Sequence, residues 1–192
     1  PSGGCGYLQL TLIAPTDRNK QNNQIIIPIA AGYPAKSLLI NEIMYNPESG
    51  TPEWFEIKNV SDNKINLCDW FFKDSQNNLN YITRNIAFLQ PGDMLVVTED
   101  MSFLDHYPDF LKKLILAPTF PTLNNNSDSL ALIDPAGNYV DSLFYTAEWG
   151  SDKGRSIERQ SPEKWSGAAD NWALSQDQNG ATPGQMNSVA MQ

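Results

Sequence analysis

The sequence is poor in the residues from which catalytic and metal sites are most often built. Its 192 residues include one histidine, His106, and two cysteines, Cys5 and Cys68. A zinc site normally takes three or four ligands, so one histidine argues against a histidine-based zinc site. A hydrolytic triad needs a nucleophile beside a positioned base. No serine or cysteine near His106 stands in a nucleophile-elbow context, and we expect this histidine to be exposed or to cap a helix.

The two cysteines lack the spacing of a metal site. Cys68 lies in a stretch where apolar residues alternate with others, and a buried free thiol is the ordinary state of a cysteine there. A disulfide between Cys5 and Cys68 stays open as an alternative, because the sequence alone cannot place their Cα atoms.

Positive charge and long apolar runs are also scarce. The 13 lysines and arginines are scattered and outnumbered by 22 acidic residues, which gives a net charge of −9. Duplex nucleic acid binding normally requires a basic stripe, so we exclude nucleic acid as a partner. The longest apolar run, residues 25–31, is interrupted by Pro28 and falls far short of the ~20 residues of a membrane helix, so we expect no membrane insertion. The chain starts at Pro1 without the basic and apolar regions of a leader peptide, and we interpret it as a piece of a longer protein.

What the sequence does contain is frequent, evenly spread turn signals. Thirteen prolines and twelve glycines separate short apolar runs, and residues 90–93 and 134–137 fit tight turns between strands. Many short strands with turns about every ten residues predict an all-β sandwich or barrel. The runs that we expect to form its strands are 38–45, 54–60, 65–73, 80–90, 94–98, 129–134, 138–146, 155–160 and 171–175.

Two further elements are expected outside this set. Residues 101–116 place apolar side chains at helical spacing, and Pro108 should split this insert into two short helical pieces. Residues 7–13 and 24–30 predict an N-terminal β-hairpin. The pattern breaks near residue 33, so we divide the chain into residues 1–35 and residues 36–192.

A two-stranded hairpin is marginal in water on its own, and an apolar one invites pairing. We therefore expect residues 1–35 to be the end of a preceding β-sandwich domain, in contact with neighbouring domains of the parent chain. Exposed in the present chain, the hairpin should pair with a second copy and form a homodimer.

The strand sequences of residues 38–188 resemble a known family in content and order. The segments that carry the resemblance are NEI at 41–43, EWFEIKN at 53–59, NLCDW at 66–70, LQPGDMLVV at 89–97, LNNNSDSL at 123–130, VDS at 140–142, GRSIER at 154–159, NW at 171–172, TPG at 182–184 and NS at 187–188. In combination they resemble a lamin-tail domain.

The resemblance implies an immunoglobulin-like β-sandwich with a short helical insert. The sequences of these segments are similar to those of the prokaryotic branch of the family. This branch occurs in multi-domain, often exported proteins beside adhesion-type sandwiches or hydrolases. It therefore implies an extracellular or cell-surface location in a prokaryote. No coiled-coil heptads precede the domain, so the nuclear-filament role is not supported. The family has no generally assigned catalytic residues to transfer.

Charged residues on the predicted strands give one set of candidate site residues. Glu42 and Glu56 fall in phase with apolar neighbours, and a carboxylate buried there needs a partner. Arg155 and Arg159 alternate with Ile157, so we predict a structural ion pair between one of these arginines and one of the two glutamates. The alternative is a carboxylate-based hydrolase, in which two such groups, Glu53 included, act as acid and base.

Two weaker candidate sites concern ligands. Asn124, Asn126 and Asp128 form an oxygen-rich stretch that predicts structural calcium, although Asn and Asp clusters are also turn formers. No other cofactor is expected. Trp149 and Trp165 lie in loop-like surroundings and are the two aromatic residues that we expect to contact a ligand.

We conclude from the sequence that the chain is a non-catalytic binding or spacer module of a larger, exported, multi-domain protein, with a protein or glycan as its ligand. The alternatives are the carboxylate-based hydrolase and a calcium-dependent ligand-binding domain.

Overall fold

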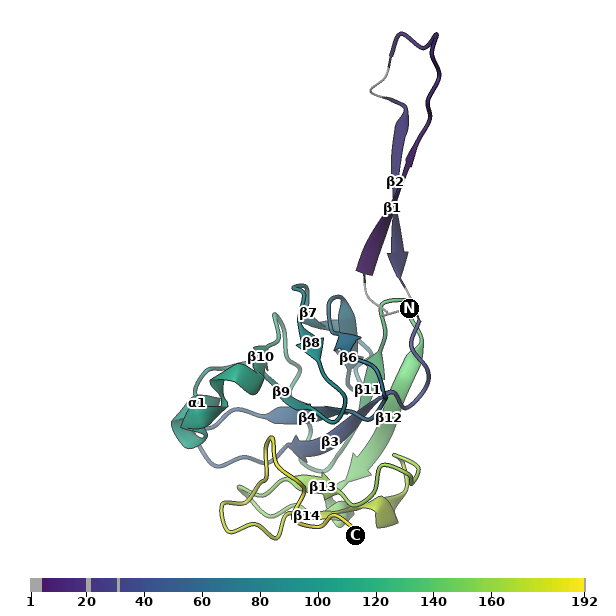
Figure 1. Ribbon diagram of the computed structural model, residues 1–192. Helices are drawn as coiled ribbons and strands as arrows, with labels where there is room; N and C mark the ends of the chain where they lie inside the picture. Colours follow the sequence, from purple (N-terminus) through teal and green to yellow (C-terminus); the bar gives the residue numbers. More distant parts are fainter. Residues whose placement is uncertain (1–4, 20–21, 31, 192) are drawn as a thin grey trace.

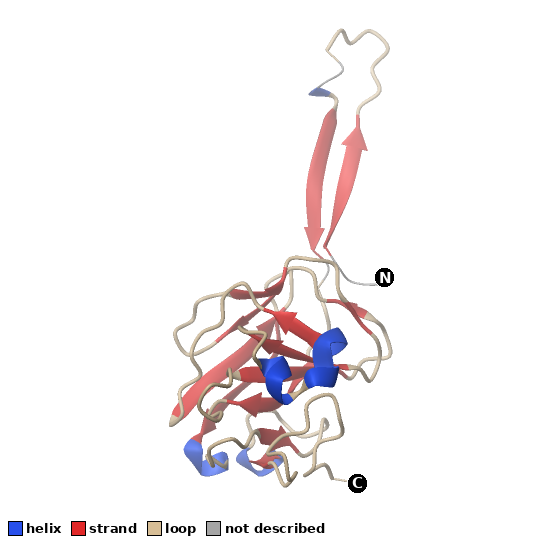
Figure 2. Ribbon diagram, turned by 90° about the vertical axis from the view of Figure 1, so that its left-hand side faces the viewer, coloured by secondary structure: helices blue, strands red, loops and turns tan. Residues whose placement is uncertain are grey.

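The computed structural model describes residues 5–19, 22–30 and 32–191, without the side chains of residues 5–7, 28 and 29. Two strands, β1 (Cys5–Thr11) and β2 (Gln24–Ala30), pair antiparallel and form the expected N-terminal hairpin. The hairpin projects away from the rest of the molecule (Figures 1 and 2). The rest of the described chain forms two packed sheets and one short two-stranded pair.

The larger sheet has six strands, in the order β10-β9-β4-β3-β13-β14. The smaller one has four strands, in the order β12-β11-β6-β7, and a short pair, β5-β8, lies beside them. The strands of the larger sheet are β3 (Leu38–Met44), β4 (Trp54–Asn59), β9 (Met94–Thr98), β10 (Leu114–Leu116), β13 (Ile157–Arg159) and β14 (Trp172–Leu174). The others are β5 (Ile65–Asn66), β6 (Trp70–Lys73), β7 (Asn80–Thr83), β8 (Phe88–Leu89), β11 (Ser127–Ile133) and β12 (Tyr139–Thr146).

The core lies between the two sheets because apolar residues alternate along the strands. In β6, Trp70 and Phe72 are completely buried, whereas Phe71 and Lys73 point outward and are only partly covered. A period of two is what a half-buried strand requires. The expected all-β, immunoglobulin-like sandwich is therefore confirmed, with turns at residues 90–93 and 134–137 where Gly92 and Gly137 adopt positive φ.

The helical insert is confirmed in part. Pro108 separates α1 (Phe103–His106) from the 3₁₀ helix η2 (Pro108–Lys113), as expected from its missing N–H. The prediction of helix for residues 114–116 is wrong, because they form β10 and pair parallel with β9. Pairing with β9 gives hydrogen-bond partners to backbone N–H and C=O groups that a helix interrupted at Pro108 would leave without partners.

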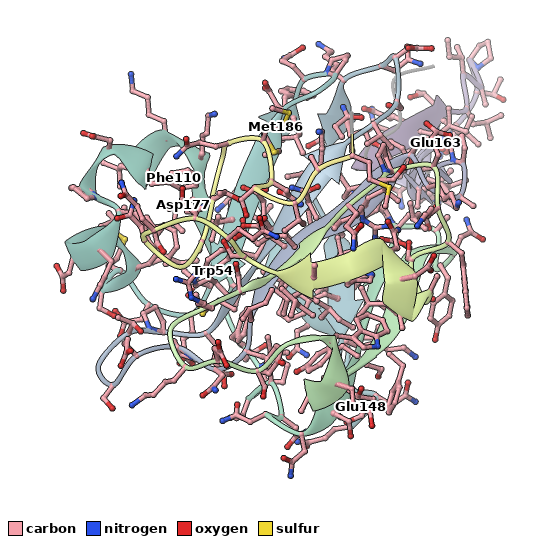
Figure 3. All side chains as sticks on the ribbon, turned by 90° about the horizontal axis from the view of Figure 1, so that it is seen from below. Trp54, Phe110, Glu148, Glu163, Asp177 and Met186 are labelled. Carbon is pink, nitrogen blue, oxygen red and sulfur yellow. The ribbon has the colours of Figure 1, made fainter. Side chains whose placement is uncertain are left out.

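The insert covers the outer face of the larger sheet. A second apolar cluster there joins Met44, Trp54 and Val96 of the sheet to Phe103 of α1 and to Ala181 of the C-terminal segment. That segment, residues 175–191, has no regular structure of its own. In Figure 3 it crosses beneath the sheet, with Asp177 and Met186 labelled on it and Phe110 of the insert beside it. Two further 3₁₀ turns are η3 (Ala147–Trp149) and η4 (Ala169–Asn171).

The expected free thiol at position 68 is wrong, because Cys68 is disulfide-bonded. The chain's other cysteine is Cys5, whose side chain is outside the described set. Within the described residues, no helix is long and apolar enough to span a membrane.

Candidate functional site

Three glutamates form a row across the middle of the larger sheet. The strand register places Glu42 of β3 directly opposite Glu56 of β4 on one side and Glu158 of β13 on the other. All three side chains are fully buried. Three neighbouring carboxyl groups out of contact with water are costly unless hydrogen bonds or protons compensate them.

The C-terminal segment supplies most of those hydrogen bonds. Glu42 accepts one from the Thr182 amide at 2.9 Å and one from the Ser156 hydroxyl at 2.6 Å. Glu158 accepts from the hydroxyl groups of Thr182 at 2.9 Å and Ser188 at 2.7 Å. These hydrogen bonds therefore attach the irregular C-terminal segment to the glutamate row of the sheet.

Glu56 completes this attachment. Its carboxyl accepts hydrogen bonds from the Asn41 side chain at 2.8 Å and from the Gly184 amide. Gly184 has a φ of 67°, and a Cβ at this position would lie 2.4 Å from the Phe110 ring. Only glycine fits between the row and the insert.

Burial changes the protonation of this row. It raises the pKa of Glu42 well above 4.5, and the nearby charge of Glu56 raises it further, against hydrogen bonds from Ser156 and Thr182. Burial likewise raises the pKa of Glu56 to about 7, although hydrogen bonds from Gly184 and Asn41 oppose it. Oε2 of Glu42 has no hydrogen-bond partner among the described residues, which favours its protonated form.

The predicted ion pair between these glutamates and an arginine is wrong. Arg159 instead pairs with Asp141 of β12, with Nη2 and Oδ2 3.2 Å apart and both side chains buried. Its Nε donates to the Ile40 carbonyl at 2.7 Å. Arg155 donates to the carbonyl oxygens of Ser175 and Asp177, at 2.8 and 2.9 Å. The alternation in β13 explains this, because Glu158 takes the outer face and its neighbour Arg159 is directed away from the glutamate row.

The loop predicted to bind calcium is held by nitrogen donors. Asp128 is fully buried, and its carboxylate accepts from the backbone amides of Ser75 and Asn124, both at 3.0 Å, and from the Asn124 side chain at 2.6 Å. Burial alone would raise the pKa of Asp128, but these hydrogen bonds outweigh it and lower the pKa. The Asn126 carbonyl accepts from the Ala147 amide at 2.8 Å. Among the described residues no cluster of three or more His, Cys, Asp or Glu side chains could hold a metal ion.

The two candidate tryptophans have different surroundings. Trp149 is partly buried, packs against the main core and stacks on Trp172 with ring centroids 6.0 Å apart. Trp165 is 68% exposed, and its ring lies against Gly167, where a Cβ would approach within 2.7 Å. The Trp165 ring can therefore lie against the backbone at position 167 because glycine has no side chain there.

Trp165 borders an open hollow of about 620 Å³ on the outer face of the four-stranded sheet. Its aromatic walls are completed by Tyr139 and Phe144 of β12, which are each 55% exposed. We call this set the aromatic hollow. The polar side chains that line it are Lys73, Asp74, Ser75, Asn77, Ser129 and Ser142.

Two lining residues have unusual surroundings. The Nζ of Lys73 lies 4.8 Å from the centre of the Tyr139 ring and donates a hydrogen bond to the side-chain Oδ1 of Asn77. Asp74 is 2% exposed, and its Oδ2 has no hydrogen-bond partner among the described residues. Burial raises the pKa of Asp74.

The sequence pointed to Trp165 but missed the rest of the hollow. Tyr139 and Phe144 are five residues apart, which in a regular strand would put them on opposite faces. The register shift between Leu132 and Ile133 of β11 brings both outward. An irregularity of this kind leaves no signal in the alternation of the sequence.

A family model for the lamin tail domain matches residues 32–147. The chain belongs to the lamin tail domain family. The domain is also similar to the structure of a DUF4876 family protein from Bacteroides thetaiotaomicron VPI-5482, with 12% identity, a TM-score of 0.44 and coverage of 88% of this chain and 75% of the other. Comparison with curated proteins gives no match.

Proposed function

We propose that this lamin tail domain is a non-catalytic binding module of a larger, exported protein, and that it binds its ligand in the aromatic hollow. The observation that supports this most directly is the contrast between its two polar clusters. The glutamate row is buried under the C-terminal segment, whereas the hollow is open and lined by aromatic rings and polar side chains, most of them neutral. An open, mostly apolar site with a few polar groups is typical of ligand binding.

Export is supported by the disulfide at Cys68. Disulfides persist in oxidising compartments and are rare in the cytosol. The prokaryotic, cell-surface location suggested by the sequence resemblance is consistent with this chemistry.

The proposal is tested by screening the purified chain for binding and for turnover together. We expect binding to immobilised glycans or proteins without release of product from chromogenic glycoside and ester substrates. Among carboxylates with a raised pKa, Glu53 is the one that is only half-buried, with a pKa of about 7. Substrate turnover by the wild type that is lost in Glu53→Gln, Glu42→Gln or Glu56→Gln would show that the chain is a carboxylate-based hydrolase and not a non-catalytic binding module.

The hairpin is proposed as a second contact surface. Register places Leu8 opposite Ile27 and Leu10 opposite Ile25, so these four side chains share one face, and all are exposed. The opposite face carries Gln9, Thr11 and Gln24 together with Ile26. One apolar face is what packing against another β-sheet requires, either in a preceding domain of the parent chain or in a second copy.

A further inference from the structure

We propose that the aromatic hollow is a saccharide site that takes a neutral oligosaccharide, with pyranose rings lying against Trp165, Tyr139 and Phe144. This inference rests on the proposed function and specifies the class of ligand.

The shape fits a flat ligand with apolar faces. Tyr139 and Phe144 stand on the sheet face and Trp165 borders it from a loop, while small residues such as Ser129, Ala131 and Ser142 also line the hollow. The volume of about 620 Å³ lies within the range of small-molecule sites, and the hollow is open rather than enclosed. The C–H face of a pyranose ring can cover an aromatic ring while its hydroxyl groups stay directed sideways. An open sheet face can accommodate several rings of one chain.

The charge of the lining favours a neutral ligand. Among the described residues that line it, Lys73 and Asp74 are the only ionisable side chains apart from Tyr139, and their charges are opposite. The ammonium group of Lys73 is already placed over the Tyr139 ring. The net charge of −9 on the chain further disfavours anionic ligands.

The polar groups match hydroxyl chemistry. Ser75, Ser129, Ser142 and Asn77 can each donate and accept hydrogen bonds, as sugar hydroxyls can. Oδ2 of Asp74 lacks a hydrogen-bond donor among the described residues. A buried acceptor without a donor is costly, but this oxygen is out of contact with solvent. Ser75, Asn77 and Ser142 are exposed and are the groups that would bind the hydroxyl groups of a ligand.

The experiment uses a panel of neutral hexasaccharides of glucose, xylose, mannose and N-acetylglucosamine, titrated into the chain by calorimetry. Tryptophan fluorescence gives a second signal, because Trp165 lies in the hollow. We expect at least one hexasaccharide to bind, and we expect a polygalacturonate fragment of equal length to bind more weakly. Trp165→Ala and Tyr139→Ala should each weaken binding by about tenfold or more, as loss of a central aromatic contact does.

A matched control is Phe88→Ala. Phe88 is 51% exposed and has Lys64 over its ring at 4.6 Å, as Tyr139 has Lys73, but it lies on β8 outside the hollow. Its substitution should leave the dissociation constant unchanged. Gly167→Ala should weaken binding without removing any ring, because the added Cβ displaces the Trp165 indole.

The outcomes separate the two proposals. Binding that is equally weakened by Phe88→Ala, or that survives Trp165→Ala and Tyr139→Ala, overturns the saccharide site. Absence of binding to every hexasaccharide at millimolar concentration overturns it as well, while protein ligands found in the wider screen would leave the binding module standing. Cleavage of a hexasaccharide, detected in the same samples by chromatography, overturns the non-catalytic module and leaves the saccharide specificity in place.

Discussion

The two ends of the described chain are attached to the sandwich in opposite ways. The N-terminal hairpin is regular β-structure with an exposed apolar face, and it projects from the domain (Figures 1 and 2). The C-terminal segment has no regular structure, yet Thr182, Gly184 and Ser188 are fixed by hydrogen bonds to three buried glutamates. Regular secondary structure alone therefore does not integrate a segment into this fold. A segment is integrated when its side chains and backbone have hydrogen-bond partners in the domain.

The largest effect is expected where the C-terminal segment meets the glutamate row. Gly184→Ala combines a left-handed backbone with a collision against the Phe110 ring, and we expect a loss of about 2–4 kcal/mol in the free energy of unfolding. Gly137→Ala is the matched control, since Gly137 has a φ of 87° but nothing within 4 Å of its Cβ position. We expect it to cost only ~1 kcal/mol. Equal costs in denaturant melts would mean that contact with the insert does not fix the segment.

The next prediction concerns pH and the same attachment. Glu42 and Glu56 have raised pKa values in the folded state, so the folded protein holds more protons than the unfolded chain above pH 4.5. The stability that they contribute is therefore present below about pH 4.5 and is lost as the pH rises towards the folded pKa values. Each group contributes a slope of at most about 1.4 kcal/mol per pH unit. Thermal melts between pH 5 and pH 8 should show a falling melting temperature.

Glu42→Gln should flatten that profile, because glutamine mimics the protonated carboxyl and its oxygen can still accept from Ser156 and Thr182. The variant should match the wild type near pH 5 and exceed it at pH 8. Glu163→Gln, at an exposed position, serves as the control and should leave the profile unchanged. A wild-type profile that is flat or rises from pH 5 to pH 8 contradicts the prediction.

At the other end of the chain, we expect an effect on association rather than on stability. Leu10→Lys and Ile25→Lys place charges opposite each other on the apolar face of the hairpin. Light scattering should give a dimer for the wild type and a monomer for the double variant, with melting temperatures that differ little, since both side chains are exposed. A monomeric wild type whose hairpin amides resist hydrogen exchange would assign the hairpin to the sandwich instead.

The smallest effect is expected at the Asp128 loop. Its carboxylate already accepts hydrogen bonds from Ser75 and Asn124, so millimolar calcium should hardly change the melting temperature relative to a chelator. Binding to the folded state alone would raise it by mass action. A calcium-dependent rise in melting temperature that disappears in Asp128→Asn would show that this loop binds calcium.

The sequence by itself determined the class of fold, most of its strands and the family, because alternation, turn residues and segment order are local properties. Pro108 split the insert and Gly92 and Gly137 marked turns for the same reason. It did not determine partners. Arg155 or Arg159 was expected to pair with Glu42 or Glu56, yet Arg159 pairs with Asp141. Glu42 instead accepts hydrogen bonds from donors up to 140 residues away in the chain. Tyr139 and Phe144 face the same way only because β11 and β12 shift in register. Which polar groups meet, and which aromatic rings share a surface, depend on how distant strands are aligned, and only the tertiary structure sets that alignment.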